Sequence, residues 1–388
     1  MSYGTKAMVG INASIVGENP TGLGIYSIKL IQALDRLRSD FCVYTSVPEA
    51  FPGFRASILA SPAAGRPSRG ARGHLVRLLW LQSLLRIRAR ASRLRLLLNT
   101  VPEGILGSTI AQITVVHDLL PLAFPAEYPR QQYYFRYFVP RILRSSRVVV
   151  TDSEYTRRAV IGRYGLPPGK VRVIYPGYNP DVYQPNGLSP RSRLDDQYLL
   201  YVGNLLPHKN VLGLLDALAI LRRRRPVRLV IRGDGRPAYV RAVRARVEML
   251  GLERVVTFLG YATEQTMRDL YTRAACLVLP SLGEGFGLPL LEAMACGTPV
   301  VTTRVASIPE VVGAAAVIVE AYDALALADA VYGVLTDPGL REELRARGLV
   351  QAKRFDWTET AVQMSSLVDA VHAGRLDGSE DGSSRRVL

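Results

Sequence analysis

Short runs of apolar and β-branched residues alternate along this chain with stretches of helical periodicity. Eight runs have the length and composition of buried strands: Ala7–Ile11, Ile113–Val116, Val148–Thr151, Tyr198–Val202, Val227–Ile231, Val255–Leu259, Cys276–Leu279 and Pro299–Thr303. Helical patterns such as Val211–Arg222 and Ala238–Leu250 lie between them. Strands that alternate with helices predict βαβ units and parallel sheets, so we expect an α/β fold.

The length of 388 residues predicts two domains, because single hydrophobic cores stop growing at about 250–300 residues. The segment Tyr175–Pro190 contains the turn-rich runs PGYNP and QPNG, which are typical of a linker. We therefore expect one domain over residues 1–178 and a second over residues 179–373. Residues 374–388 are polar and poor in apolar side chains, which predicts a disordered tail.

Basic residues outnumber acidic residues, 49 to 33, which gives a formal net charge of +16. This excess favours an anionic partner: a nucleic acid, an anionic membrane surface or a phosphorylated substrate. The three cysteines, Cys42, Cys276 and Cys296, are far apart and form no CxxC pair, so we expect neither a disulfide framework nor a zinc site, and a reducing cytoplasm fits. No run reaches about 18 apolar residues, so any membrane contact is expected to be peripheral.

The segment Arg66–Arg95 holds nine arginines and no acidic residue. Leucines and Trp80 are interleaved with the arginines, a pattern that predicts a basic amphipathic helix with an aromatic anchor lying on an anionic bilayer. A solvated arginine face on a core helix explains the pattern equally well. Arginine is also abundant elsewhere in the chain, as in Arg222–Arg225.

The most informative run is PSLGEGFGLPLLEAMACGTP, residues 280–299. A glycine-rich loop follows the expected strand Cys276–Leu279. A helix is predicted to start near Pro289, because proline suits the first helical turn, and to stop at Gly297. This order predicts a strand, a loop and a helix N-terminus, which together can hold a phosphate group.

Within this run, Gly285 and Gly287 allow backbone N–H groups to approach a ligand closely, and the helix behind them attracts negative charge. Glu284 lies in the loop, and Glu292 is expected in the first helical turn. Both carboxylates can accept hydrogen bonds from sugar hydroxyls. An ordinary helix-entry glutamate would explain Glu292 alone, but not the whole run.

Two glutamates separated by seven residues within EGFGLPLLEAMACGTPVV resemble the signature of the retaining glycosyltransferase family 4. The resemblance implies the GT-B fold, in which two Rossmann-like domains with parallel sheets face each other across a cleft. Residues 1–178 would then bind the acceptor and residues 179–373 the nucleotide-sugar donor, with the last helix crossing back to the first domain. The resemblance further implies that Glu284 contacts the donor sugar, that Glu292 binds the nucleotide ribose, and that the backbone of Phe286 and Gly287 supports the sugar and diphosphate.

The run YVGNLLPHKN, residues 201–210, resembles the strand and loop in which this family carries a lysine for the donor phosphate. It implies that Gly203, Asn204 and Lys209 bind the donor and that Lys209 neutralises the departing diphosphate. The sequence departs from one common form of the motif, because Asn204 stands where many relatives have an arginine. A leaving-group site with one cation, or with help from another residue, is therefore expected.

The run NPTGLGIY, residues 19–26, follows the first strand and resembles the family's N-terminal glycine loop. It implies that Gly22 and Gly24 close over the donor phosphate and the acceptor. A lone GxG is weak evidence, and its place after the first strand strengthens it.

The run VVHDLLP ends another expected strand, and ligands of open α/β sheets bind at the carboxyl ends of strands. The resemblance implies that His117 and Asp118 lie near the transferred sugar and that His117 contacts donor hydroxyls. Ser153 follows the strand Val148–Thr151, and we interpret it as the N-cap of the next helix. The family also holds the nucleotide base near the positions of Gly233–Gly235 and Gly260–Tyr261, where Tyr261 either stacks or packs.

No residue stands out as an enzyme nucleophile, so the family's mechanism is expected, with attack and departure on the same face of the sugar and retention of configuration. His117, Asp118, Lys209 and Glu284 are the candidate catalytic residues. No DxD motif occurs in a convincing context, so we expect no metal and no cofactor beside the nucleotide sugar.

The runs HDLLPLAFPAEYP and RLLWLQ resemble a subgroup of bacterial mannosyl- and rhamnosyltransferases of exopolysaccharide and lipopolysaccharide assembly. This resemblance implies GDP-mannose as donor, with UDP-glucose or another nucleotide sugar as the alternative. The basic segment Arg66–Arg95 fits an oligosaccharide acceptor carried on a polyprenyl diphosphate. The enzyme would then work from the cytoplasm, as a peripheral protein at the inner face of the cell membrane.

Three rival classes remain. A nucleic-acid-binding protein would suit the charge, but nothing resembles a helix-turn-helix, a zinc finger or an RNA-binding strand, so no nucleic-acid partner is expected. A GT-B scaffold that binds membrane or nucleic acid without catalysis is disfavoured by the intact Glu284, Lys209, His117 and Glu292. The glutamate spacing disfavours a phosphorylase or an epimerase.

Overall fold

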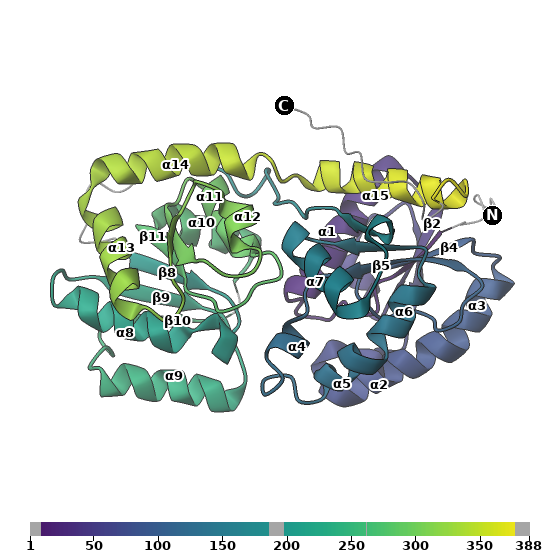
Figure 1. Cartoon of the computed structure of the whole chain (residues 1–388), viewed down its shortest axis with the longest axis horizontal. Coiled ribbons are helices and arrows are strands. Elements are labelled where there is room, and N and C mark those ends of the chain that lie inside the picture. Colours follow the sequence, from purple (N-terminus) through teal and green to yellow (C-terminus); the bar gives the residue numbers. More distant parts are fainter. Residues whose placement is uncertain (1–8, 186–197, 261, 377–388) are drawn as a thin grey trace. The chain divides into compact units, whose positions relative to one another are not determined.

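The computed structural model describes residues 9–185, 198–260 and 262–376. The chain divides into two compact units, Met1–Gly177 with Trp357–Leu388, and Tyr178–Asp356. The expected boundary at 178/179 lies one residue from this division, while the segment from Trp357 onward belongs to the first unit (Figure 1). The expected disordered tail lies outside the described residues from 377 onward.

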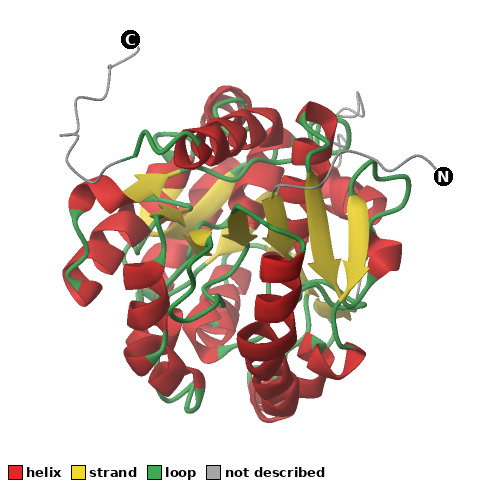
Figure 2. Ribbon diagram, turned by 90° about the vertical axis from the view of Figure 1, so that its right-hand side faces the viewer, coloured by secondary structure: helices red, strands yellow, loops and turns green. Residues whose placement is uncertain are grey.

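The first unit contains a seven-stranded sheet in the order β3-β2-β1-β4-β5-β6-β7, and every pair of neighbours is parallel. Its strands are β1 (Val9–Asn12), β2 (Phe41–Thr45), β3 (Ser57–Ala60), β4 (Leu96–Asn99), β5 (Ala111–Val116), β6 (Val148–Thr151) and β7 (Val171–Val173). Its helices are α1 (Gly22–Leu37), α2 (Gly70–Trp80), α3 (Arg86–Ala91), α4 (Leu120–Ala123), α5 (Gln131–Tyr137), α6 (Val139–Ser145), α7 (Glu154–Tyr164) and α15 (Trp357–His372). Figure 2 shows these strands between layers of helices.

The second unit contains a six-stranded sheet in the order β10-β9-β8-β11-β12-β13, also parallel throughout. Its strands are β8 (Tyr198–Val202), β9 (Arg228–Arg232), β10 (Val256–Leu259), β11 (Cys276–Leu279), β12 (Val300–Thr303) and β13 (Val317–Val319). Its helices are α8 (Val211–Arg222), α9 (Pro237–Met249), α10 (Glu264–Arg273), α11 (Leu288–Ala295), α12 (Ile308–Val312), α13 (Ala324–Thr336) and α14 (Pro338–Ala352).

The structure confirms the α/β prediction, and each of the eight predicted strands is present to within two residues. The strands β6, β8 and β11 and the helix α8 have the predicted bounds. Residues 7 and 8 of the first predicted strand lie outside the described residues. The sequence analysis missed β2, β3, β4, β7 and β13. Three of these, β3, β7 and β13, have only three or four residues and are not fully buried, so they lack the longer buried pattern by which a core strand is identified.

Helix α15 returns to the first unit and packs along α1. Trp357, at the start of α15, meets the ring of Tyr26 on α1 edge-on, with ring centroids 5.5 Å apart. Both side chains are buried in the main core of the unit, together with Met364 and Val368 on the same face of α15. These buried apolar side chains explain why α15 packs on the first unit although it follows the second unit in the sequence.

The basic segment Arg66–Arg95 is not one regular helix. Helices α2 and α3 are joined by a π-helical segment, Leu81–Leu85. The predicted aromatic anchor is wrong, because Trp80 is only 4% exposed and packs edge-on against Tyr44 at 6.0 Å. Helix α2 turns this ring toward the sheet, where it fills a core cluster with the neighbouring leucines.

One arginine of the segment Arg66–Arg95 is buried and paired with a carboxylate, so its charge is not available at the surface. Arg77 is buried and donates two hydrogen bonds to the carboxylate of Glu103, at 2.8 and 2.9 Å, and a third to the carbonyl of Gly65 at 2.7 Å. The apolar side chains left at the surface are Leu75, Leu79, Leu84 and Ile87, each more than half exposed. No described helix is long and apolar enough to cross a membrane.

Candidate functional site

Each sheet has one point where the strand order reverses. In the second unit this switch point lies between β8 and β11, and in the first unit between β1 and β4. The connections that leave two adjacent strands at such a point run in opposite directions, so a crevice opens beyond their carboxyl ends, and ligands of α/β proteins bind there. The candidate residues of each unit can be placed against its switch point.

In the second unit, Lys209 follows β8 and Glu284 follows β11, so the two strands at the switch point supply one partner each. Lys209 Nζ donates to Glu284 Oε2 at 2.7 Å, and Ser281 Oγ donates to Glu284 Oε1 at 2.8 Å. The side chains of Lys209 and Glu284 are 15% and 9% exposed. The fold thus brings together two predicted residues that are 75 positions apart in the sequence.

Backbone contacts hold the two loops in register. The amide of Leu282 donates to the carbonyl of His208 at 2.7 Å, which ties the β11 loop to the β8 loop. Ser307 Oγ reaches the carbonyls of Glu284 and Phe286, at 3.2 and 3.4 Å. The position of the carboxylate is therefore determined by the backbone around it as well as by its ion pair.

The β8 loop also lies against the loop after β9. The amide of Leu205 donates to the carbonyl of Asp234 at 2.8 Å, and Gly203 donates to the carbonyl of Arg232 at 3.1 Å. Gly233 has φ +152°, and a Cβ added there would lie 1.9 Å from the carbonyl oxygen of Gly203. Glycine is required at this position because any side chain would push the two loops apart.

The backbone at the start of α11 is arranged as the sequence predicted. Gly287 has φ +100° and is the N-cap, Pro289 lies in the first turn, and Gly297 follows the helix with φ +75°. The Phe286 side chain is buried and meets Phe355 edge-on at 5.5 Å. Phe286 therefore offers a ligand its backbone and not its ring.

Glu292 lies in the second turn of α11, not in the first as predicted, because the helix begins at Leu288. Tyr271 Oη donates to Glu292 Oε2 at 2.8 Å. Burial, and then the charge of Glu292, raise the pKa of Tyr271 well above its ordinary value, so the phenol keeps the proton that it donates. Glu284 and Glu292 thus have different partners, Lys209 and Tyr271.

In the first unit, His117 follows β5 and is buried. Its Nδ1 lies 2.6 Å from Asp152 Oδ2, and its Nε2 lies 2.8 Å from the carbonyl oxygen of Thr100. Burial opposes the charged imidazolium, but the charge and hydrogen bond of Asp152 outweigh it, so the pKa of His117 is raised. Since a carbonyl only accepts, His117 donates from Nε2, and in this structure both ring nitrogens have protein partners.

The residues around His117 belong to the same unit's switch point. Thr100 directly follows β4, and its hydroxyl donates to the carbonyl of Asn12, the last residue of β1. Ser27 Oγ on α1 donates to Thr100 Oγ1 at 2.8 Å. The ring of Tyr26 meets His117 edge-on, with centroids 4.5 Å apart. His117 is therefore held by residues that follow β1, β4 and β6.

The remaining candidates of this unit have local partners. Asp118 Oδ1 accepts from the amide of Leu120 at 2.9 Å, at the start of α4. Gly22 is the first residue of α1, and Gly24 lies in the same first turn, where a Cβ would meet Pro20 at 2.9 Å. The N-cap interpretation of Ser153 is confirmed, because its hydroxyl accepts from the amide of Thr156 at 3.1 Å.

Sequence reasoning missed several polar side chains that hold the predicted ones, namely Thr100, Asp152, Tyr271, Ser281 and Ser307. Ser281 could have been found, because it lies three residues from Glu284 within the same motif. The partners of His117 and Glu292 lie far from them in the sequence, so no local sequence pattern points to them.

Among the described residues no group of three or more His, Cys, Asp or Glu side chains could hold a metal ion. Asn204 lies in the β8 loop, where its carbonyl accepts from Tyr201 Oη, and Tyr261 lies outside the described residues.

The two halves of the chain match two family models. Residues 20–182 match the model described as Glycosyltransferase Family 4, and residues 189–350 match the model described as Glycosyl transferases group 1. An O-antigen chain mannosyltransferase B of Escherichia coli is 32% identical over 262 residues, which cover 65% of this chain and 68% of that protein. A D-inositol 3-phosphate glycosyltransferase of Corynebacterium glutamicum is 30% identical over 254 residues, which cover 61% of each chain.

Solved structures agree on the fold. A sucrose-phosphate synthase from Thermosynechococcus elongatus aligns with a TM-score of 0.79 at 21% identity, covering 94% of this chain and 99% of that one. Anabaena HepE, solved in complex with UDP and glucose, aligns with a TM-score of 0.73 at 18% identity, covering 94% and 100%. Two parallel-sheet units with a glycine-rich loop and a carboxylate–lysine pair at the switch point define a glycosyltransferase of the GT-B type.

Within that class, the matched models and the Escherichia coli relative identify the family. The chain belongs to glycosyltransferase family 4, as its EGFG run and glutamate spacing indicated. The sequence expectation of a GT-B glycosyltransferase is thereby confirmed. The chain spans about two thirds and three fifths of the lengths of the two curated relatives.

Proposed function

We propose that this protein is a retaining glycosyltransferase that transfers mannose from GDP-mannose to an oligosaccharide carried on a polyprenyl diphosphate. The observation that carries the proposal is the Lys209–Glu284 pair at the switch point of the second sheet. One partner suits a diphosphate and the other suits sugar hydroxyls, so the pair is complementary to the two parts of a nucleotide sugar. The mannosyltransferase relative supports the choice of sugar.

In the proposed reaction, the bond from the anomeric carbon to the diphosphate oxygen breaks, and that oxygen leaves with the electron pair. The acceptor hydroxyl forms the new bond on the same face of the sugar, and its proton passes to the departing diphosphate. Lys209 would exchange its bond to Glu284 for one to a diphosphate oxygen. A charge-assisted donor placed where negative charge develops lowers the barrier most.

Glu284 would then be free of its lysine and would accept from a donor hydroxyl, while Ser281 keeps its second oxygen in place. Glu292, oriented by Tyr271, would accept from the ribose hydroxyls. The backbone amides at Gly285 and Gly287 would support the phosphates at the N-terminus of α11. No metal and no further cofactor takes part in this proposal.

The acceptor's lipid would hold the enzyme at the inner face of the cell membrane. The segment Arg66–Arg95 supports this part, because Leu75, Leu79, Leu84 and Ile87 are exposed between its arginines. A basic surface with exposed apolar side chains binds anionic bilayers through electrostatic attraction and through burial of the apolar side chains. Flotation of the protein with anionic and with neutral vesicles tests this contact. Equal flotation with both kinds of vesicle would overturn the proposal that Arg66–Arg95 binds an anionic membrane.

The donor is tested by calorimetric titration of the full chain with GDP-mannose, UDP-glucose and the free nucleotides, for the wild type and Glu292→Ala. We expect GDP-mannose to bind and the variant to bind it about 10-fold more weakly, the effect of one lost charge-assisted hydrogen bond. Glu253→Ala is the matched control, because it removes an equal charge from an exposed position between α9 and β10 of the same unit. The control should bind GDP-mannose as the wild type does.

Each outcome of the donor titration tests a different part of the proposed function. Preference for UDP-glucose would keep the site and overturn the mannosyl assignment, as the UDP complex of HepE would favour. Binding without transfer to any lipid-linked acceptor would favour a scaffold without catalysis. Product NMR checks retention, because the new bond must keep the anomeric configuration of the donor.

A further inference from the structure

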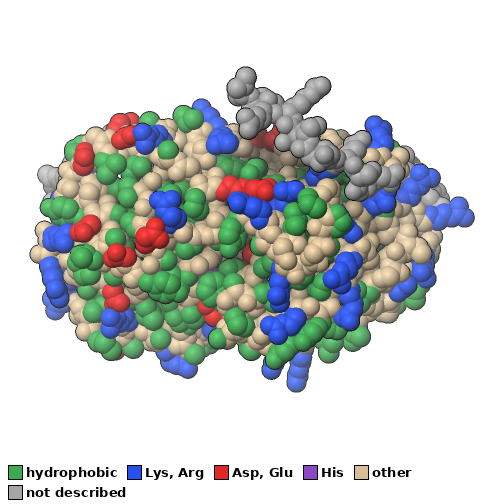
Figure 3. Space-filling view, viewed as in Figure 1, with side chains coloured by type: hydrophobic (Ala, Val, Ile, Leu, Met, Phe, Trp, Pro, Cys, Tyr) green, Lys and Arg blue, Asp and Glu red, His purple; other side chains and the backbone are tan. Residues whose placement is uncertain are grey.

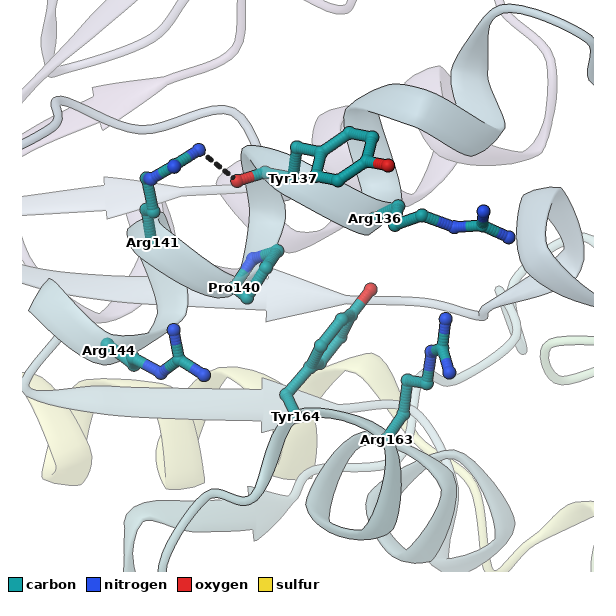
Figure 4. Close-up of a pocket in the computed structure, with 7 residues that line it drawn as sticks. All are labelled: Arg136, Tyr137, Pro140, Arg141, Arg144, Arg163 and Tyr164. Carbon is teal, nitrogen blue, oxygen red and sulfur yellow. Dashed lines mark hydrogen bonds between the residues drawn. The ribbon is translucent and has the colours of Figure 1, made fainter.

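Four arginines from three helices line a hollow on the first unit (Figure 4). Arg136 comes from α5, Arg141 and Arg144 from α6, and Arg163 from α7. The hollow has a volume of about 290 Å³, just below the range of about 300–1,000 Å³ for small-molecule sites. It is therefore large enough for a phosphate and its substituent, and small for a whole nucleotide sugar.

The charge in this hollow is uncompensated. No carboxylate lines it, and among the described residues none of the four guanidinium groups makes an ion pair. Arg136 and Arg163 point to the same side of the Tyr164 ring in Figure 4. Tyr164 Oη donates to the carbonyl of Phe135 at 2.9 Å, which fixes the position of the ring.

Helix geometry explains only part of this arrangement. Arg136, Arg144 and Arg163 each lie in the last turn of a helix, where a cation interacts favourably with the helix dipole. That effect would be served by arginines pointing in any direction at each helix end. It does not account for all three lining one hollow. Arg141 lines the same hollow, and its Nη1 donates to the carbonyl of Tyr137 at 2.7 Å (Figure 4).

Exposed aromatic side chains lie at and near the hollow. Of the exposed aromatic side chains in this region, Tyr137 lines the hollow and is 52% exposed. Tyr133 and Phe138 are near Tyr137 in the sequence and are 55% and 46% exposed, but they do not line the hollow. Helix α5 lies against α2, since Tyr134 meets the ring of His74 edge-on at 4.7 Å. Hydrophobic and basic side chains lie together on this part of the first unit (Figure 3).

We propose that the Arg136–Arg141–Arg144–Arg163 hollow binds the phosphate of a membrane phospholipid head group, with Tyr133, Tyr137 and Phe138 resting at the level of the head groups. Guanidinium groups hold phosphate oxygens through paired N–H bonds, which gives preference for phosphate over other anions. Tyrosine rings favour the boundary between water and hydrocarbon. A soluble phosphate would explain the arginines, but not the three exposed aromatic side chains at and near the hollow.

The inference rests on the proposed membrane contact and not on sugar transfer. It adds a discrete head-group site to the diffuse attraction of Arg66–Arg95, so the two make different predictions. Diffuse attraction responds to the surface potential of a membrane, whatever anion creates it. A phosphate site also distinguishes between anions at equal potential.

The test is vesicle co-sedimentation of the full chain with phosphatidylcholine vesicles that contain either phosphatidylglycerol or oleate, matched in zeta potential. We expect the wild type to bind the phosphatidylglycerol vesicles on the order of 10-fold more tightly, the effect of one or two charge-assisted hydrogen bonds. Arg136→Gln with Arg163→Gln should lose this preference. The matched control, Arg88→Gln with Arg90→Gln on α3, should weaken binding to both vesicles alike and keep the preference.

The variant Arg136→Lys with Arg163→Lys keeps the positive charges and their interaction with the helix dipoles. It therefore tests the proposal even if the glutamine variant is unstable. It should bind both vesicles but lose most of the preference, because lysine cannot form the paired bonds. Equal binding of wild type to both vesicles would overturn the proposal, as would a preference that survives in both arginine variants. Inhibition by inorganic phosphate without any vesicle preference would assign the hollow to a soluble phosphate and overturn the lipid.

GDP-mannose titration of the same variants separates this result from the proposed activity. The four arginines lie on the first unit, whereas the proposed donor residues around Lys209 and Glu284 lie on the second. Donor binding should therefore be unchanged in all of them. Loss of vesicle preference with intact donor binding supports the head-group site, and absent donor binding in the wild type would count against the proposed function alone.

Discussion

The replacement Lys209→Met should destabilise the second unit by leaving the Glu284 carboxylate buried without its counter-charge. Glu284 is 9% exposed, and its two oxygens accept one bond each, from Lys209 and from Ser281. Methionine matches the length of the lysine stem, so the change removes the charge with little loss of packing. Glu284→Gln removes the other charge and leaves an amide oxygen for Ser281.

The contacts of Glu284 determine how much stability the Lys209→Met variant is expected to lose. Breaking a buried ion pair by removing one partner costs about 3–5 kcal/mol. Ser281 keeps one oxygen of Glu284 bonded, so we expect the lower end, about 3 kcal/mol. Removing both charges is nearly neutral for a buried pair, so the double variant should lose no more than about 1 kcal/mol. In a domain of this size, 1 kcal/mol corresponds to about 2–4 °C in Tm, which predicts a fall of about 6–12 °C for Lys209→Met.

The assay is urea unfolding of the full chain, followed by far-UV circular dichroism, for the wild type, both single variants and the double variant. Arg224→Gln is the control, because it breaks an exposed pair with Asp329 and should change stability by less than about 1 kcal/mol. The reasoning is refuted if the double variant is as unstable as Lys209→Met, since the carboxylate would then not be the source of the cost.

Three further predictions concern neighbouring contacts. Tyr271→Phe should weaken nucleotide binding about 10-fold with little change in fold, because Glu292 loses its orienting donor; titration with GDP checks this. The raised pKa of His117 means that its ion pair stabilises the first unit fully below about pH 6.5, and that this contribution is lost as pH rises through the raised pKa; Asp152→Asn should flatten that dependence in melts from about pH 5 to 9. Gly233→Ala should lower stability by about 3 kcal/mol or more through its clash with the β8 loop, whereas a melt unchanged within about 1 °C would contradict the close approach.

The sequence by itself determined eight of the described strands, the helix α8 and the family of this protein. Strands β8 and β11 and helix α8 follow from apolar runs and from helical periodicity, which are local patterns. Gly287 and Gly297 bound α11 because their backbone conformations, φ +100° and +75°, suit glycine and few other residues. The motif around Glu284 was recognisable for the same reason, since its residues are adjacent in the chain.

The tertiary structure alone decided which of these residues meet. Lys209 joins Glu284, and His117 joins Asp152, because the strand order places the ends of their strands together, and no local pattern encodes that order. The same holds for Trp80, whose segment is apolar on more than one face. Which face is buried depends on the surface that the helix packs against. The Trp80 ring packs into the core beside Tyr44, a position that the sequence pattern did not distinguish from a place on a membrane.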